Sequence, residues 1–72
     1  MRVLNHKQEE VEVEFENHDT PITIVNKAIT KGLSVSENWV LIFEADRQKK
    51  NQFLKTAGVN NSSVVVIEQA PT

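Results

Sequence analysis

Residues 19–33 read DTPITIVNKAITKGL and predict a helix with both of its ends marked. Asp19 or Thr20 is a capping side chain, and a proline follows at the first helical position, where its fixed φ suits a helix start. Gly32 is expected to end the helix in a left-handed conformation, and Leu33 to pack back onto it. One helix is therefore predicted between these two ends.

The predicted helix spans about residues 21–31 and is expected to bury one face. Its aliphatic side chains recur at spacings of three and four, which is typical of a helix that packs one side against a core. The expected buried face carries Ile22, Val25 and Ile29, flanked by Ile24 and Ala28.

The residues before the helix alternate between apolar and acidic side chains. Val11, Val13 and Phe15 take every second position, with glutamates between them. A period of two predicts a half-buried strand whose acidic side chains form its solvated face. The first residues of the chain also alternate, so residues 1–16 are predicted to form an antiparallel hairpin. Its turn lacks glycine, and a loop of more than two residues is expected.

Two continuous apolar runs follow the helix. Residues 39–43 read WVLIF and residues 64–67 read VVVI, and both runs favour strands. Residues 44–51 between them are polar, whereas Phe53 and Leu54 are expected to form a short strand or turn against the core. This order predicts an α+β fold in which one helix packs on one face of a mixed sheet of four to five strands.

Length and composition restrict the classes of protein to consider. The chain has 72 residues, a net charge of −2 and no cysteine. This length suits a single domain of marginal stability, and the lack of cysteine excludes disulfides, thiolate catalysis and cysteine-ligated zinc. A mildly acidic chain lacks the basic surface of a nucleic-acid binder, and no apolar run approaches the roughly 20 residues of a membrane span.

The remaining expectations follow from what the chain does not carry. No catalytic constellation, phosphate-binding loop or metal-ligand cluster is recognised, so a non-enzyme without cofactor or metal is expected. A folded domain over residues 1–69 and a flexible tail over residues 70–72 are predicted. The expected location is the cytoplasm, with the nucleus as an alternative, because no secretory signal is recognised.

Three stretches of the chain resemble the ubiquitin-like β-grasp superfamily. The helix start at residues 19–29 is similar to ubiquitin's Asp-Thr-Ile start, and residues 41–43 repeat its Leu-Ile-Phe. Residues 54–67, LKTAGVNNSSVVVI, are similar to the family's final turn and closing strand. The resemblance covers residues 1–69. It implies a sheet ordered second, first, last, third and fourth strand, with the first and last parallel at its centre.

The chain departs from that superfamily at its end. Conjugated modifiers and sulphur carriers end in Gly-Gly, whereas residues 69–72 read QAPT and the two glycines are Gly32 and Gly58. This difference argues against conjugation and sulphur transfer, so a modifier or sulphur carrier is an alternative and not the main interpretation. A Ras-association-like GTPase-binding domain is another, although the four glutamates of the second strand argue against a Ras-type partner. Residues 36–41, SENWVL, and the Asn-Asn pair before the last strand resemble the N-terminal ubiquitin-like domains of tether-type UBX proteins, and they are also similar to Ras-association domains.

Alternation along the strands predicts an exposed aliphatic face on the sheet. If the odd-numbered residues of 39–43 face the helix, Ile42 faces outward. In the last strand, the first and third residues of 64–67 are expected to face the helix, so that Val65 and Ile67 face outward. The predicted partner-binding residues are Leu4, Ile42, Val65 and Ile67, with Arg47 and Lys49 as a basic rim.

The corresponding face of ubiquitin carries an isoleucine-centred patch that most of its partners bind. The resemblance therefore implies a non-catalytic protein–protein interaction module. Two alternatives for the exposed aliphatic side chains are a homodimer through the same face and no role beyond strand formation.

Overall fold

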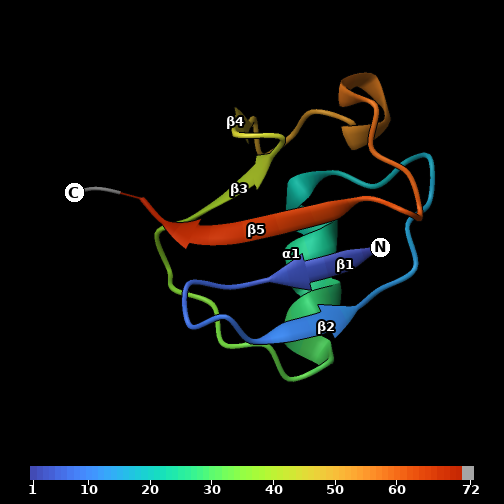
Figure 1. Ribbon diagram of the computed structural model, residues 1–72. Helices are drawn as coiled ribbons and strands as arrows, with labels where there is room; N and C mark the ends of the chain where they lie inside the picture. Colours follow the sequence, from blue (N-terminus) through green and yellow to red (C-terminus); the bar gives the residue numbers. More distant parts are fainter. Residues whose placement is uncertain (71–72) are drawn as a thin grey trace.

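The computed structural model describes residues 1–70, which form one five-stranded mixed sheet and one α-helix (Figure 1). The elements are β1 (Arg2–Leu4), β2 (Glu10–Glu12), α1 (Pro21–Thr30), β3 (Trp39–Phe43), β4 (Asp46–Gln48), a 3-10 helix (Leu54–Ala57) and β5 (Val64–Gln69). The sheet order is β2-β1-β5-β3-β4, with β1 and β5 parallel and the other neighbours antiparallel. The predicted α+β class and sheet order are confirmed.

The predicted tail at residues 70–72 falls largely outside the described residues. Ala70 is described, and its N–H donates to the Asn38 carbonyl at 2.6 Å. No helix of the described chain is long and apolar enough to cross a bilayer.

The hydrophobic core lies between α1 and the inner face of the sheet. The sheet contributes Val3, Leu41, Val65 and Ile67, all fully buried, and α1 contributes Ile24, Val25 and Ala28. Figure 1 shows α1 behind the strands, so the described elements cover one face of the sheet and leave the other open. The fold therefore gives the sheet a core face and an outer face.

The ends of α1 are as predicted. Thr20 caps the helix, because its hydroxyl accepts from the Thr23 N–H while the Thr23 hydroxyl accepts from the Thr20 N–H. Gly32 has a φ of 100°, which an L side chain rarely adopts, and the Leu33 N–H donates to the Ala28 carbonyl at 3.0 Å. This left-handed cap turns the chain back and buries Leu33.

The buried face of α1 differs from the prediction. Ile24, Val25 and Ala28 are buried, whereas Ile22 and Ile29 are 37% and 49% exposed. Ile22 and Ile29 lie seven residues apart and therefore on the same side of the helix. That side is rotated by about 100° around the helix axis from the centre of the buried face. Ile24 and Ala28, which were expected only to flank the buried face, are fully buried together with Val25.

The strand β4 is an edge strand in a stretch that was expected to be polar connection. It pairs with β3 through its backbone and contributes no buried apolar side chain. A two-residue turn of Glu44 and Ala45 joins the two strands, with φ values of 52° and 66° that are typical of a type I′ turn. Phe53 is 56% exposed, while Leu54 begins the 3-10 helix and is buried.

A buried amide organises the loop between β1 and β2, which is longer than two residues as predicted. The Asn5 Oδ1 atom accepts from the N–H groups of Lys7 and Glu9 at 3.0 and 2.9 Å. Its Nδ2 atom donates to the Ser34 carbonyl at 2.9 Å. Gln8 takes the left-handed conformation with a φ of 64°. The loop thus forms without glycine because one side chain satisfies its backbone donors.

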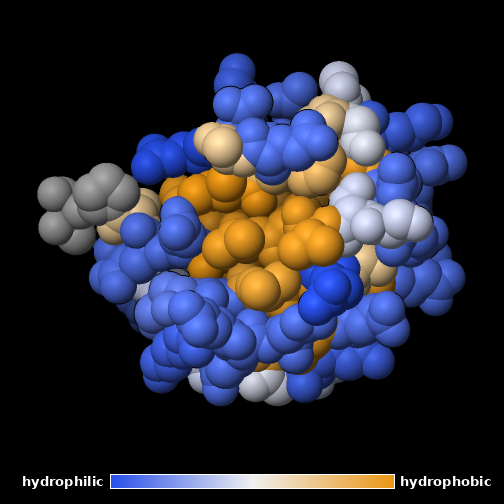
Figure 2. Space-filling view, in the orientation of Figure 1, coloured by the Kyte–Doolittle hydropathy of each residue, from blue (hydrophilic) through white to orange (hydrophobic). Residues whose placement is uncertain are grey.

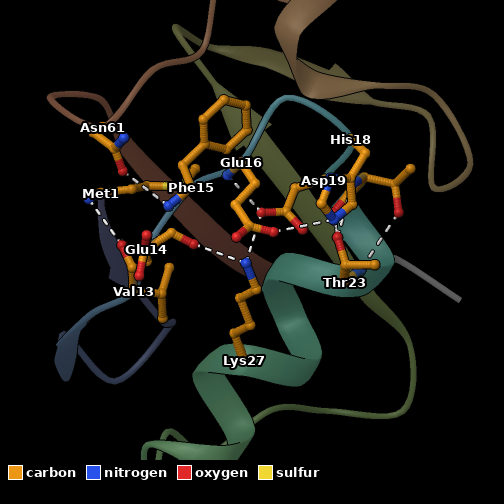
Figure 3. A network of polar contacts seen from close by, with 11 residues as sticks. Met1, Val13, Glu14, Phe15, Glu16, His18, Asp19, Thr23, Lys27 and Asn61 are labelled. Atoms are coloured by element: carbon orange, nitrogen blue, oxygen red, sulfur yellow. Dashed lines mark hydrogen bonds and ion pairs between the residues drawn. The ribbon is translucent and has the colours of Figure 1, made fainter.

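A polar network fixes α1 against the end of the first hairpin (Figure 3). Asp19 is 1% exposed, and its Oδ2 atom accepts from the Lys27 Nζ atom at 2.7 Å and from the Glu16 N–H at 2.8 Å. The Lys27 Nζ atom also donates to the Glu14 carbonyl at 2.8 Å. One buried carboxylate and one lysine therefore tie the helix to the segment that precedes it.

Candidate interaction surface

The outer face of the sheet carries a continuous row of side chains across all five strands. Backbone pairing aligns, in sheet order, Glu10, Leu4, Val66, Ile42 and Arg47. Residues paired across neighbouring strands point to the same face of a sheet, so these five form one cross-strand row. Its three aliphatic members are half-buried at the centre, and its two charged members are exposed at the ends.

Two further valines widen the apolar centre of this row. Val64 is 44% exposed, and Val40 is half-buried and pairs with Glu68 of β5. Figure 2, which views the sheet in the orientation of Figure 1, shows an apolar area at the centre of this face with polar side chains around it. We call Leu4, Val40, Ile42, Val64 and Val66 the aliphatic patch.

The expected outward orientation of Val65 and Ile67 is wrong. Both side chains lie in the core, at 0% and 1% exposure. Four consecutive aliphatic residues have no alternation of their own, so they do not reveal which of them face inward. The exposed Glu68 supplies that information, because a charged residue that faces solvent places Val66 and Val64 on its own side of the strand.

The other predicted residues lie on or beside the outer face. Leu4 and Ile42 point outward as predicted, and Arg47 is the cross-strand neighbour of Ile42. Lys49 is exposed and follows directly after β4. Whether these residues contact a partner stays a prediction.

The two ends of the cross-strand row differ in charge. At the β2 end, the Arg2 guanidinium binds both oxygens of the Glu10 carboxylate, and Glu12 lies beside them in register with Arg2. The hydrogen bond from Arg2 lowers the pKa of the Glu10 carboxyl below its ordinary value. At the β4 end, Arg47 has no ion-pair partner among residues 1–70. The outer face is therefore acidic at one edge and basic at the other.

A concave region lies away from the aliphatic patch, between α1 and the residues that directly follow β2. It encloses about 300 Å³ and is lined by Val13, Glu14, Lys27, Thr30 and Lys31. Its central cation, the Lys27 ammonium, is already bound by Asp19 and by the Glu14 carbonyl. The aliphatic patch is the stronger candidate site because its apolar side chains are contiguous and partly exposed, whereas the ammonium of the concave region is already neutralised.

The fold defines a small α+β domain whose five-stranded mixed sheet and single helix are compatible with a β-grasp. No protein-family model matches the chain, and no curated protein matches its sequence. The interpretation of this surface therefore depends on its own geometry and charge.

Proposed function

We propose that the protein is a non-catalytic, ubiquitin-like interaction module of the cytoplasm that binds a protein partner through the aliphatic patch. The observation that supports this function is the alignment of Leu4, Val66 and Ile42 on the outer face of the three central strands. A domain of 72 residues has little apolar surface to spare, so contiguous aliphatic side chains on its open face indicate a contact surface.

The shape of the surface favours a macromolecule as the ligand. Sites for small molecules are concave and enclose most of the ligand, whereas the outer face of a small sheet is broad and open. An apolar centre with a charged rim is also the usual arrangement of a protein–protein interface. Here the rim consists of Glu10 and Arg2 on one side and Arg47 on the other.

The test replaces two residues of the aliphatic patch by charged residues that should leave the fold intact. Leu4→Lys places an ammonium opposite Glu10, and Ile42→Glu places a carboxylate opposite Arg47. Cross-strand pairs of opposite charge stabilise a sheet, so the double variant is expected to remain folded. Tagged wild-type and variant chains are compared for the proteins they capture, with folding checked by circular dichroism. The double variant should lose the partners of the wild type.

The matched control places the same charge on the other side of the molecule. Ile29 is 49% exposed on α1, and Ile29→Glu should leave capture unchanged. A folded Leu4→Lys/Ile42→Glu variant that captures the same proteins as the wild type, the untagged wild-type chain included, would show that the aliphatic patch is not the binding surface.

A further inference from the structure

The cross-strand row has opposite charges at its ends and aliphatic side chains between them. Glu10 stands at the β2 end, Arg47 at the β4 end and Val66 in the middle. Consider a two-fold axis that runs along β5 over the outer face of the sheet, in front of Val66. A second copy related to the first by this axis carries the same row in the reverse direction. Glu10 of one copy then faces Arg47 of the other, and Leu4 faces Ile42.

We propose that a second copy of this chain occupies the aliphatic patch, in a face-to-face dimer whose two rows run in opposite directions. This inference rests on the proposed function, because it names the partner of the same surface. A two-fold interface repeats each contact. The dimer therefore contains two Glu10–Arg47 pairs and two Leu4–Ile42 contacts, with Val66 against its own counterpart at the axis.

The charges of the row select this axis over the other two-fold arrangement. An axis perpendicular to the strands sets Glu10 against Glu10 and Arg47 against Arg47, which places like charges in contact. The axis along β5 instead brings Arg47, which has no ion-pair partner among residues 1–70, to the acidic β2 edge, where Glu12 adds a second carboxylate beside the Arg2–Glu10 pair. The charge pattern of one chain is thus complementary to itself in one orientation.

The dimensions of the molecule permit an interface of biological size. The molecule measures 27 × 24 × 18 Å, so its broadest face measures at most 27 × 24 Å. Covering the broad face buries at most about 650 Å² per copy, or about 1,300 Å² in the dimer, which exceeds the roughly 1,000 Å² expected of a biological interface.

One residue opposes the dimer. Glu68 lies two positions beyond Val66 on β5 and is exposed on the same side of the strand, close to the proposed axis. The two copies therefore bring their Glu68 carboxylates toward each other. Removing this repulsion with Glu68→Gln should tighten the dimer about two- to fivefold.

Charge reversal tests the proposed orientation by sedimentation between about 1 μM and 1 mM protein, a range that covers weak and moderate dimers. The wild-type chain should associate. Arg47→Glu and Glu10→Lys each create two like-charge contacts, so each variant alone should associate at least about tenfold more weakly. An equimolar mixture of the two variants should recover dimers, because each mixed pair contains two contacts of opposite charge. Circular dichroism confirms that each variant is folded.

The controls separate this proposal from the proposed function. Lys31→Glu reverses a charge at the end of α1, away from the row, and should not change association. The proposed dimer is overturned if the wild-type chain is monomeric. It is also overturned if the mixture of Arg47→Glu and Glu10→Lys chains associates no more strongly than either variant alone. A different outcome is a monomeric wild type that captures a different protein, which the Leu4→Lys/Ile42→Glu variant no longer captures. In that case the dimer is wrong and the aliphatic patch is still the binding surface. If that variant also captures normally, both proposals are wrong.

Discussion

At the scale of single residues, Asp19 joins three segments of the chain through its carboxylate and its backbone. Its carboxylate accepts from the Glu16 N–H and from Lys27 of α1, and its backbone carbonyl accepts from the Leu54 N–H at 3.1 Å. The loop before the helix, the helix and the 3-10 helix therefore meet at one residue. Because the side chain is buried, this arrangement depends on the carboxylate being ionised and paired.

Asp19 is expected to make the stability of the protein sensitive to acid. Burial opposes ionisation, but the hydrogen bonds from Lys27, the Glu16 N–H and Thr23 outweigh it and lower the pKa of the Asp19 carboxyl. The ionised group therefore stabilises the fold above its unfolded pKa of about 4, and this contribution is lost as the pH falls through the lower folded pKa. Asp19→Asn should reduce the unfolding free energy at pH 7 by about 2 kcal/mol and weaken its fall in acid, as measured by urea denaturation from pH 7 to pH 2.

The matched control makes the same change at an exposed aspartate. Asp46 lies on the edge strand β4, and Asp46→Asn should alter the unfolding free energy by less than about 0.5 kcal/mol. If Asp19→Asn costs no more than this control, the buried ion pair does not stabilise the protein.

At the scale of elements, the turn between β3 and β4 uses residues that its backbone does not favour. Glu44 and Ala45 both have positive φ values, which cost side chains other than glycine and asparagine. The combined substitution Glu44→Asn and Ala45→Gly supplies the preferred type I′ residues. It should raise the unfolding free energy by about 1 kcal/mol, because relief of the strain exceeds the entropic cost of one glycine. Thermal unfolding measures the change.

A second alanine provides the comparison for this turn. Ala57 lies in the 3-10 helix and has no positive φ, so Ala57→Gly gains no relief of strain. We expect it to lower the unfolding free energy by up to about 1 kcal/mol. The unfolding free energy should therefore rise for the substitutions in the turn and fall for Ala57→Gly. A loss of stability in both variants would contradict the assignment of a type I′ turn.

The elements also show which features the sequence predicts. The ends of α1 were predictable because Thr20 and Gly32 act on the backbone within a few residues. The strand β3 was predictable from its aromatic and β-branched composition, whereas β4 was not, because an exposed edge strand is specified by backbone pairing and carries no apolar pattern. The side of an element that faces the core depends on tertiary packing, and this is where the predictions for α1 and β5 were wrong.

The candidate site was therefore predicted in part. Leu4 and Ile42 point outward as predicted because the odd-numbered residues beside them were correctly assigned to the core, although residues 39–43 do not alternate in polarity. Val64 and Val66 lie within an uninterrupted aliphatic run, and their orientation is set by β1 and β3, which hold β5 between them. The exposed Glu68, two positions beyond Val66, indicates the same orientation locally.

At the scale of the whole molecule, stability comes from a core on one side of the sheet only. Val65 and Val66 are neighbours in the central strand β5, yet the first is fully buried beneath α1 and the second belongs to the aliphatic patch. A domain of 72 residues is stable by only about 4–11 kcal/mol, so a defect in this single core has a large effect. The two valines therefore report separately on the core and on the surface.

Val65→Thr and Val66→Thr make the same nearly isosteric change on the two sides of one strand. Val65→Thr buries a hydroxyl in an apolar core and should lower the unfolding free energy by about 2 kcal/mol, whereas Val66→Thr should lower it by less than about 0.5 kcal/mol. Urea denaturation of both variants measures the difference. Equal losses would mean that the outer face is as enclosed as the core. A larger loss at Val66 would mean that β5 presents its other side to α1, and both the aliphatic patch and the dimer proposed on it would then be wrong.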